Sequence, residues 1–155
     1  MVVVDAEPTI TGDDLAGLVA TMDEAAAAYI DGDIEHYLSM FDHADDYTLM
    51  PPYGGATVRG FERTDEGLAA TKAFFASGEG RFDCQQTYSS GDLAVLVGVE
   101  RQHGLVGGLP DQDWSLRVTL VFRRRADRWE LVHRHADALV DEIPFDRFAE
   151  LARAF

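Results

Sequence analysis

The sequence is poor in cysteine and lysine, and it has no hydrophobic run long enough to cross a bilayer. Its one cysteine, Cys84, cannot form a disulfide within the chain and cannot build a zinc site by itself. Asp5 and Glu7 stand where a secretory signal would need basic residues. These absences predict a cytoplasmic protein with no membrane span and no disulfide framework.

Basic residues are also scarce, because 13 of them face 28 acidic residues and the net charge is -15. Such a surface repels polyanions, so nucleic acids and anionic membranes are disfavoured as partners. The run 123–125 with Arg128 is interpreted as the solvated end of a hairpin, with a phosphate patch as the alternative. No glycine-rich phosphate loop or nucleophile elbow is present, and we expect no cofactor and no metal.

What the chain does contain is enough apolar material for one core. It has 155 residues, of which 46% are hydrophobic, and we expect a single domain over 1–155 with residues 1–11 as an N-terminal extension. Whether the acidity reflects adaptation to salt stays open.

Apolar residues at helical spacing predict three helices in the first half of the chain, followed later by a short one. Thr11 and Asp14 are typical of a helix start, and Gly32 separates the first helix from the second. The expected helices cover 13–30, 34–41 and 64–76, and a closing helix begins at Pro144 with the stripe Phe148, Leu151 and Phe155.

The second half changes to a period of two, which is typical of strands. After a short strand over 47–50, strands are expected over 81–89, 93–103, 114–124 and 128–139, with an irregular loop over 104–112. Helices followed by a run of strands predict an α+β fold.

Three segments resemble the nuclear transport factor 2-like superfamily, in its SnoaL-like and ketosteroid-isomerase-like branch. They are YIDGDIEHYLSMFD (29–42), LMPPYGGATVRG (49–60) and the hairpin RVTLVF with WELVHRH (117–135). The hairpin is similar to the end of the association domain of calcium/calmodulin-dependent kinase II. The resemblance covers about residues 12 to 140.

This resemblance implies a cone, in which a strongly curved antiparallel sheet wraps the first helix and leaves an apolar ligand pocket. It also implies a homodimer through the convex face of the sheet. The superfamily holds isomerases, cyclases, dehydratases and assembly domains on one scaffold, so the fold alone does not decide the activity.

The steroid isomerase mechanism cannot be carried over. The carboxylate base of those enzymes corresponds to Met50, whose thioether transfers no proton, and their oxyanion-binding tyrosine corresponds to Ala25. Catalytic residues are therefore unknown at this stage.

Strand alternation gives the candidate ligand-binding residues. If Leu116, Val118, Leu120 and Phe122 face the concave side, Arg134 joins them, while Trp129, Leu131, His133 and His135 face outward. We also expect Val95, Val97 and Val99 to face inward, with Arg101 at the mouth.

Arg101 occupies the position where the hub-like domains carry an arginine, and their second pocket arginine corresponds to Ala136. A guanidinium there could clamp an acidic ligand, and a salt bridge to a neighbouring strand is the equally weighted alternative.

Further lining residues are expected at Tyr37, Tyr53 and Met50, with a core or rim position as the alternative for the tyrosines. His133, His135 and Asp137 alternate along one strand, but we interpret them as an interface rather than a metal site.

Two hypotheses remain. The first is a small-molecule pocket protein that acts without cofactor as a lyase, isomerase or cyclase on a small, partly apolar ligand that could be acidic. The second is a non-catalytic ligand-binding or dimerisation domain with a vestigial pocket.

Overall fold

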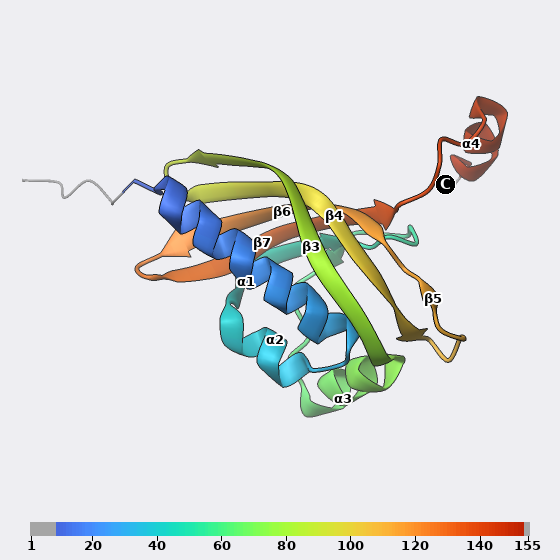
Figure 1. Ribbon diagram of the computed structural model, residues 1–155, viewed down its shortest axis with the longest axis horizontal. Helices are drawn as coiled ribbons and strands as arrows, with labels where there is room; N and C mark the ends of the chain where they lie inside the picture. Colours follow the sequence, from blue (N-terminus) through green and yellow to red (C-terminus); the bar gives the residue numbers. More distant parts are fainter. Residues whose placement is uncertain (1–8, 154–155) are drawn as a thin grey trace, which may run out of the picture.

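A long helix lies across the concave side of a strongly curved sheet (Figure 1). The computed structural model describes residues 9–153. The helices are α1 (Gly12–Ile30), α2 (Ile34–Met40), α3 (Asp65–Phe74) and α4 (Phe145–Leu151). The strands are β1 (Asp42–Met50), β2 (Val58–Arg59), β3 (Phe75–Ser90), β4 (Leu93–Val106), β5 (Gln112–Asp113), β6 (Leu116–Arg125) and β7 (Arg128–Ala138).

Helix α1 begins as the sequence predicts. Thr11 accepts a hydrogen bond from the backbone N–H of Asp14, and the Asp14 carboxylate accepts one from the backbone N–H of Thr11, which forms a capping box. The buried side of the helix includes Leu18 and Met22. It therefore packs against the sheet through the stripe that its spacing predicts.

The turn after α1 requires a glycine. Gly32 has φ of +74°, and a Cβ at this position would collide with the carbonyl oxygen of Phe75. The absence of a side chain thus lets the start of β3 approach the end of α1, and it fixes where α2 turns back.

The strands run in the order β2-β1-β7-β6-β4-β3, with β5 paired to β4. Neighbours are antiparallel except for β1 and β7, which are parallel. The sheet is curved and does not close, so the predicted α+β cone is confirmed. Within residues 9–153, no helix combines the length and hydropathy that a bilayer span requires.

The inner face of β6 is as predicted, and that of β4 is not. Val118, Leu120 and Phe122 are buried, and Leu120 lies opposite Leu96 on β4. Because opposite residues share a face, the inward series on β4 is 94, 96, 98 and 100. The expectation that Val95, Val97, Val99 and Arg101 point inward is therefore wrong.

A β-bulge at Val132 changes which residues of β7 face inward, compared with the prediction. Phe122 lies opposite Leu131, and Val121 lies opposite His133, so Val132 is an extra residue between the two pairs. Leu131 is buried beside Phe122, and Trp129 packs on the same core. The outward placement expected for Leu131 and Trp129 is wrong, whereas the inward placement of Arg134 is confirmed.

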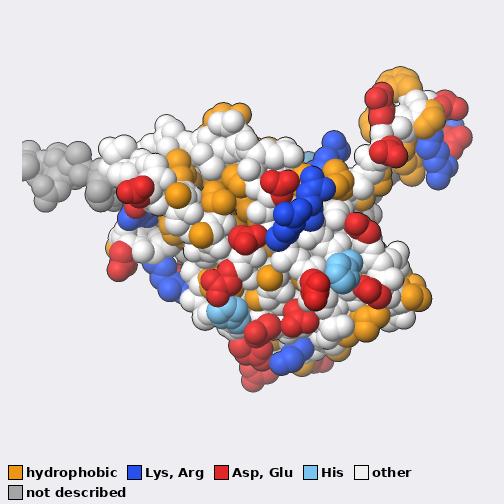
Figure 2. All heavy atoms as spheres, viewed as in Figure 1, with side chains coloured by type: hydrophobic (Ala, Val, Ile, Leu, Met, Phe, Trp, Pro, Cys, Tyr) orange, Lys and Arg blue, Asp and Glu red, His pale blue; other side chains and the backbone are white. Residues whose placement is uncertain are grey.

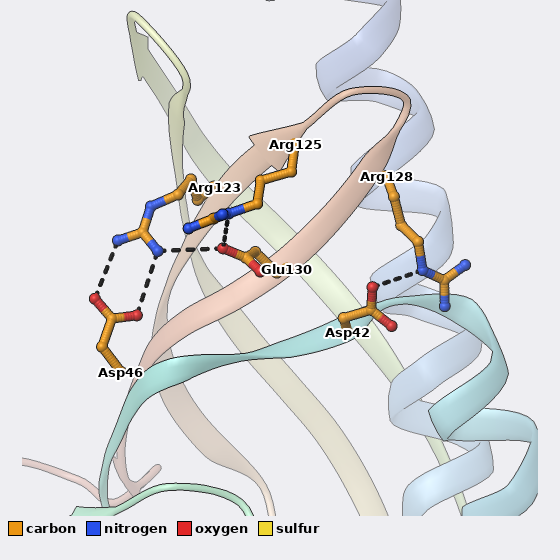
Figure 3. Close-up of polar contacts among 6 residues, drawn as sticks. All are labelled: Asp42, Asp46, Arg123, Arg125, Arg128 and Glu130. Atoms are coloured by element: carbon orange, nitrogen blue, oxygen red, sulfur yellow. Dashed lines mark hydrogen bonds and ion pairs between the residues drawn. The ribbon is translucent and has the colours of Figure 1, made fainter.

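The arginine run at the β6–β7 turn lies in ion pairs (Figure 3). Arg123 bridges Asp46 and Glu130, at 3.2 Å from each, and Arg128 binds Asp42 at 2.7 Å. Two strands far apart in sequence are thereby held together at this end of the sheet. These charges hold β1 beside β7, where the pairing is parallel.

The remaining elements differ in length from the predictions. Strand β1 begins at Asp42 rather than at 47, and β4 continues to Val106 into the predicted loop. Helix α4 forms with Phe148 and Leu151 exposed, and it stands clear of the sheet in Figure 1. Phe155 and most of the expected N-terminal extension lie outside the described residues.

Candidate functional site

An ion pair occupies the inner face of the sheet. Arg134 Nη2 donates a hydrogen bond to Glu100 Oε2 at 3.1 Å, and Arg134 Nη1 contacts the other carboxylate oxygen. The Glu100 side chain is 7% exposed and that of Arg134 is 22% exposed. Both side chains are therefore mostly buried, and that of Glu100 is the more deeply buried of the two.

Arg134 stays charged because Glu100 compensates for its burial. Burial alone would lower the pKa of Arg134, but the charge and hydrogen bond of Glu100 raise it above its ordinary value. An isolated buried charge would be costly, and here each member neutralises the other. The inner site thus carries two opposite charges and no net charge from this pair.

Three tyrosines lie near enough to the ion pair for its charges to affect their pKa values. Burial raises the pKa of Tyr29 and of Tyr37, and it raises the pKa of Tyr47 to about 12. In each case the charge of Arg134 opposes the rise and that of Glu100 adds to it. At neutral pH all three are hydroxyls, which can donate or accept hydrogen bonds beside the pair.

Tyr47 reaches the inner face through an irregularity in β1. His43 lies opposite Leu131, but the next paired residue is Thr48 opposite His133, so the chain bulges between them. Ala44 and Tyr47 in this segment are buried. A regular strand would not accommodate these extra residues, so the bulge is what places Tyr47 in the core.

A buried histidine, His43, contacts the hydroxyl of Tyr37. His43 Nε2 is 3.1 Å from the Tyr37 hydroxyl, and the imidazole ring stacks on Phe61 at 3.8 Å between centroids. Its Nδ1 is buried and has no hydrogen-bond partner among the described residues. Burial lowers the pKa of His43 to about 3, helped by the charge of Arg63. The imidazole is therefore neutral in the folded protein and links Tyr37 to the core.

The structure brings together two of the five candidate binding residues, Tyr37 and Arg134. Arg101 lies on the other face of the sheet and pairs with Asp83 at 3.3 Å, which was the alternative considered for it. Met50 ends β1 and is 42% exposed, and Tyr53 in the following turn is 87% exposed. Any ligand contact of Arg101, Met50 or Tyr53 stays a prediction.

Sequence reasoning missed Glu100, which is the buried carboxylate of the site. It also missed Tyr29 and Tyr47. The signal for Glu100 was its position directly after the apolar stretch 93–99, where two adjacent charges, Glu100 and Arg101, must face opposite sides of the strand.

A groove of about 450 Å³ lies between α1 and β3, outside the cone. Its lining is about half polar and half apolar. It combines the small or apolar residues Ala16, Val19, Ala20, Phe82 and Cys84 with the charged residues Asp23, Arg81 and Asp83. Burial raises the pKa of the Cys84 thiol, which keeps it neutral.

The convex face carries the predicted histidine pair. His133 Nδ1 lies 2.8 Å from Thr48 Oγ1, and the rings of His133 and His135 are 6.5 Å apart. In the part of the chain that the structure describes, no three His, Cys, Asp or Glu residues are grouped as metal ligands.

The chain belongs to the SnoaL-like domain family, whose family model matches residues 18–141. The match covers the helices and strands that build the cone, including both members of the ion pair. A search of curated proteins gave no match.

Solved structures share the fold. The calcium/calmodulin-dependent protein kinase II association domain from Xanthomonas campestris is 18% identical, with a TM-score of 0.58 over 92% of this chain and 99% of that one. A putative dehydratase of the NTF2-like family from Streptomyces avermitilis is 24% identical, with a TM-score of 0.58 over 81% of this chain and 94% of that one. The hub domain from S. rosetta is 22% identical, with a TM-score of 0.57 over 87% of this chain and 99% of that one. These similarities establish the fold and leave the activity open.

Proposed function

We propose that this protein binds a small, partly apolar molecule on the inner face of the cone, at the Glu100–Arg134 pair. The observation that carries the proposal is a mostly buried charged pair on the inner face of the sheet, whose charges act on three buried or partly buried tyrosines. Inward polar groups set in an apolar surface are typical of ligand sites.

The charge balance favours a neutral ligand over an acidic one. A ligand carboxylate that approached Arg134 would also face the carboxylate of Glu100, which is hydrogen-bonded to the same guanidinium. Like charges in a poorly solvated site repel strongly. An amide or an alcohol can instead accept from Arg134 and donate to Glu100 without adding charge, and a ketone can accept from Arg134.

Glu100 also supports a catalytic role without a cofactor. A lyase, isomerase or cyclase reaction needs a group that takes a proton from carbon, and a buried carboxylate beside a ligand can do this. Arg134 and the tyrosine hydroxyls are placed to stabilise negative charge that develops on a ligand oxygen. On this proposal Glu100 is the base and Arg134 the oxyanion partner.

Binding is tested with benzamide and benzoate, which have similar shapes and differ in charge. At about ten times its dissociation constant, benzamide should stabilise the protein by about 1.4 kcal/mol and raise Tm by roughly 3–6 °C. Benzoate should give a much smaller shift. A protein that responds equally to both probes, or to neither, contradicts the proposed charge selectivity.

The variant Glu100→Gln provides the matched control. It removes the negative charge and leaves Arg134 to bind an anion, so the preference should reverse in favour of benzoate. Circular dichroism checks that the variant is folded. An unchanged preference would place the ligand site elsewhere.

Catalysis is tested by proton exchange. Phenylacetone incubated in heavy water should lose its α-proton NMR signals faster with the protein than with Glu100→Gln. Equal rates would leave the protein as a binding domain without this chemistry.

A further inference from the structure

Helix α4 and the residues before it expose apolar side chains that nothing in the described chain covers. Phe145 is 82% exposed, Leu151 60% and Phe148 52%, and Val140 in the preceding segment is 65% exposed. Figure 1 shows α4 standing clear of the sheet at the end of β7, and Figure 2 shows apolar side chains around it. This segment, residues 139–151, is called the arm below.

The arm has little to stabilise it by itself. Helix α4 is seven residues long, and Pro144 at its start makes no side-chain capping hydrogen bond. Isolated helices shorter than about 12 residues are marginal in water, and helices in proteins are stabilised mainly by packing of an apolar face. Helix α4 therefore needs an apolar surface to pack against, and at its observed position the described chain provides none.

The groove between α1 and β3 offers such a surface. Its volume of about 450 Å³ is large enough for aromatic side chains, and Figure 2 shows apolar side chains gathered over these two elements. Its two carboxylates are already engaged, because Asp23 accepts from the backbone N–H of Phe82 and Asp83 pairs with Arg101. Arg81, also in the lining, makes no ion pair with any residue in 9–153.

Arg81 of the groove and the acidic arm carry opposite charges, although the groove also contains Asp23 and Asp83. The arm carries four acidic residues and one arginine, and that arginine, Arg147, is paired with Glu150. Asp146 follows the exposed Phe145 and is available to a cation. Aromatic side chains would fill the groove while a carboxylate meets Arg81, which is a common arrangement for interface anchors.

We propose that α4 of one copy docks in the α1–β3 groove of a second copy, with Phe145 and Phe148 as the anchors. The chain has a net charge of -15, so two copies repel one another unless opposite charges are brought into register. Seating the acidic arm beside Arg81 does this. Reciprocal exchange of two arms forms a closed, two-fold dimer.

The area reaches the lower end of what such a dimer needs. A whole aromatic side chain contributes about 150–250 Å². Because Phe145 is 82% exposed and Phe148 52%, the four phenylalanines in two arms can bury roughly 400–670 Å², and the groove surfaces that they cover add a similar area. Stable interfaces bury about 1,200–2,000 Å² in total. This inference does not depend on the inner site, since none of its residues belongs to the ligand proposal.

Sedimentation velocity over a range of concentrations tests the oligomer. We expect the unaltered chain to sediment as a dimer, and the variant F145S/F148S to dissociate with a dissociation constant at least about 100-fold higher. Ala20→Glu, which adds bulk and negative charge inside the groove, should have the same effect. The control Leu109→Ser removes an exposed apolar side chain from a loop away from both surfaces and should leave the dimer intact.

The single native cysteine lines the groove and allows a direct test of the contact. In Phe148→Cys, oxidation with copper phenanthroline should link position 148 of one chain to Cys84 of another, and peptide mapping identifies the pair. Leu109→Cys serves as the control and should not link to Cys84.

Each outcome decides the proposal. A dimer lost in F145S/F148S and in Ala20→Glu, with the 148–84 link between chains, supports it. A monomer at all concentrations overturns it, and so does a 148–84 link within one chain, which would mean that the arm folds back onto its own groove. A dimer that survives both changes overturns it as well.

Discussion

Arg134 and Glu100 meet on the inner face of the sheet although strand β6 lies between their own strands. Arg134 is level with Leu120 and Glu100 with Leu116, so the guanidinium crosses β6 diagonally to reach the carboxylate. The ion pair therefore links β4 to β7 across β6, at the point where we propose that the ligand binds.

Removing one member of this pair should destabilise the protein more than removing both. Arg134→Met leaves a buried carboxylate without its counter-charge, and we expect a loss of about 3 kcal/mol in the free energy of unfolding. The double variant R134M/E100M should lose less than Arg134→Met alone, because two apolar side chains replace two charges. Urea unfolding measures both values, and strictly additive losses would mean that the two charges do not depend on each other.

His43 should make the protein less stable in mild acid. Its pKa of about 3 in the folded state lies below the ordinary value of 6.5, so the unfolded chain binds a proton that the folded chain refuses. Above pH 6.5 this difference does not reduce the free energy of unfolding. As the pH falls from 6.5 toward 3, the free energy of unfolding decreases. Between pH 7 and pH 5 the loss should be about 2 kcal/mol, at 1.36 kcal/mol per unit below 6.5.

The variant His43→Phe should remove this part of the pH dependence, measured by urea unfolding at pH 7 and pH 5. The control His103→Gln should change the pH dependence in the opposite direction. The hydrogen bond and charge of Asp111 raise the pKa of His103, so its contribution is present at low pH and is lost as the pH rises. An identical slope in His43→Phe and the unaltered protein would contradict the buried, neutral imidazole.

Alanine at position 32 should be costly, whereas alanine at position 17 should stabilise. At Gly32 the positive φ alone costs a side chain about 1–3 kcal/mol, and the contact with the Phe75 carbonyl adds to it. Gly17 lies within α1, and a Cβ added there would have no neighbouring atom within 4 Å, so alanine should gain about 0.5–1 kcal/mol. Thermal unfolding of both variants compares the two effects, and similar Tm values would refute the close approach at Gly32.

The arginine network in Figure 3 should contribute more than a single surface ion pair. Arg123 is 23% exposed and holds two carboxylates from different strands, so Arg123→Ala should cost about 1–2 kcal/mol. The control is Lys72→Ala, whose pair with Glu35 is well exposed and should be worth less than about 0.5 kcal/mol. Equal effects in chemical unfolding would show that the network adds nothing to the parallel β1–β7 pairing.

The helices and the inner stripe of β6 could be predicted because polar residues mark their other side. In β6 the stripe Val118, Leu120 and Phe122 alternates with Arg117, Thr119 and Arg123, so the sequence itself indicates the buried face. The inward position of Arg134 followed from that stripe, whereas the cone was implied by the resemblance to the superfamily.

The faces of β4 could not be predicted in this way. Residues 94–99 are apolar or glycine at every position, so a period of two leaves no signal, and the choice of the valine series turned Arg101 inward and Glu100 outward. Only the pairing of Leu96 with Leu120 shows the opposite arrangement. The carboxylate of the site was missed for that reason.

Val132 is an extra residue between two cross-strand pairs. Strand β7 can therefore lose one residue at this position without changing the pairing on either side. Shortening the chain by Val132 would leave Leu131 opposite Phe122 and His133 opposite Val121, so both faces of the hairpin would keep their side chains. Shortening it at His133 instead would move Val132 into that place and keep Arg134 where it is, at the expense of the contact with Thr48. Natural variants of this hairpin that are one residue shorter are therefore compatible with an intact inner site, provided that the missing residue lies at the bulge.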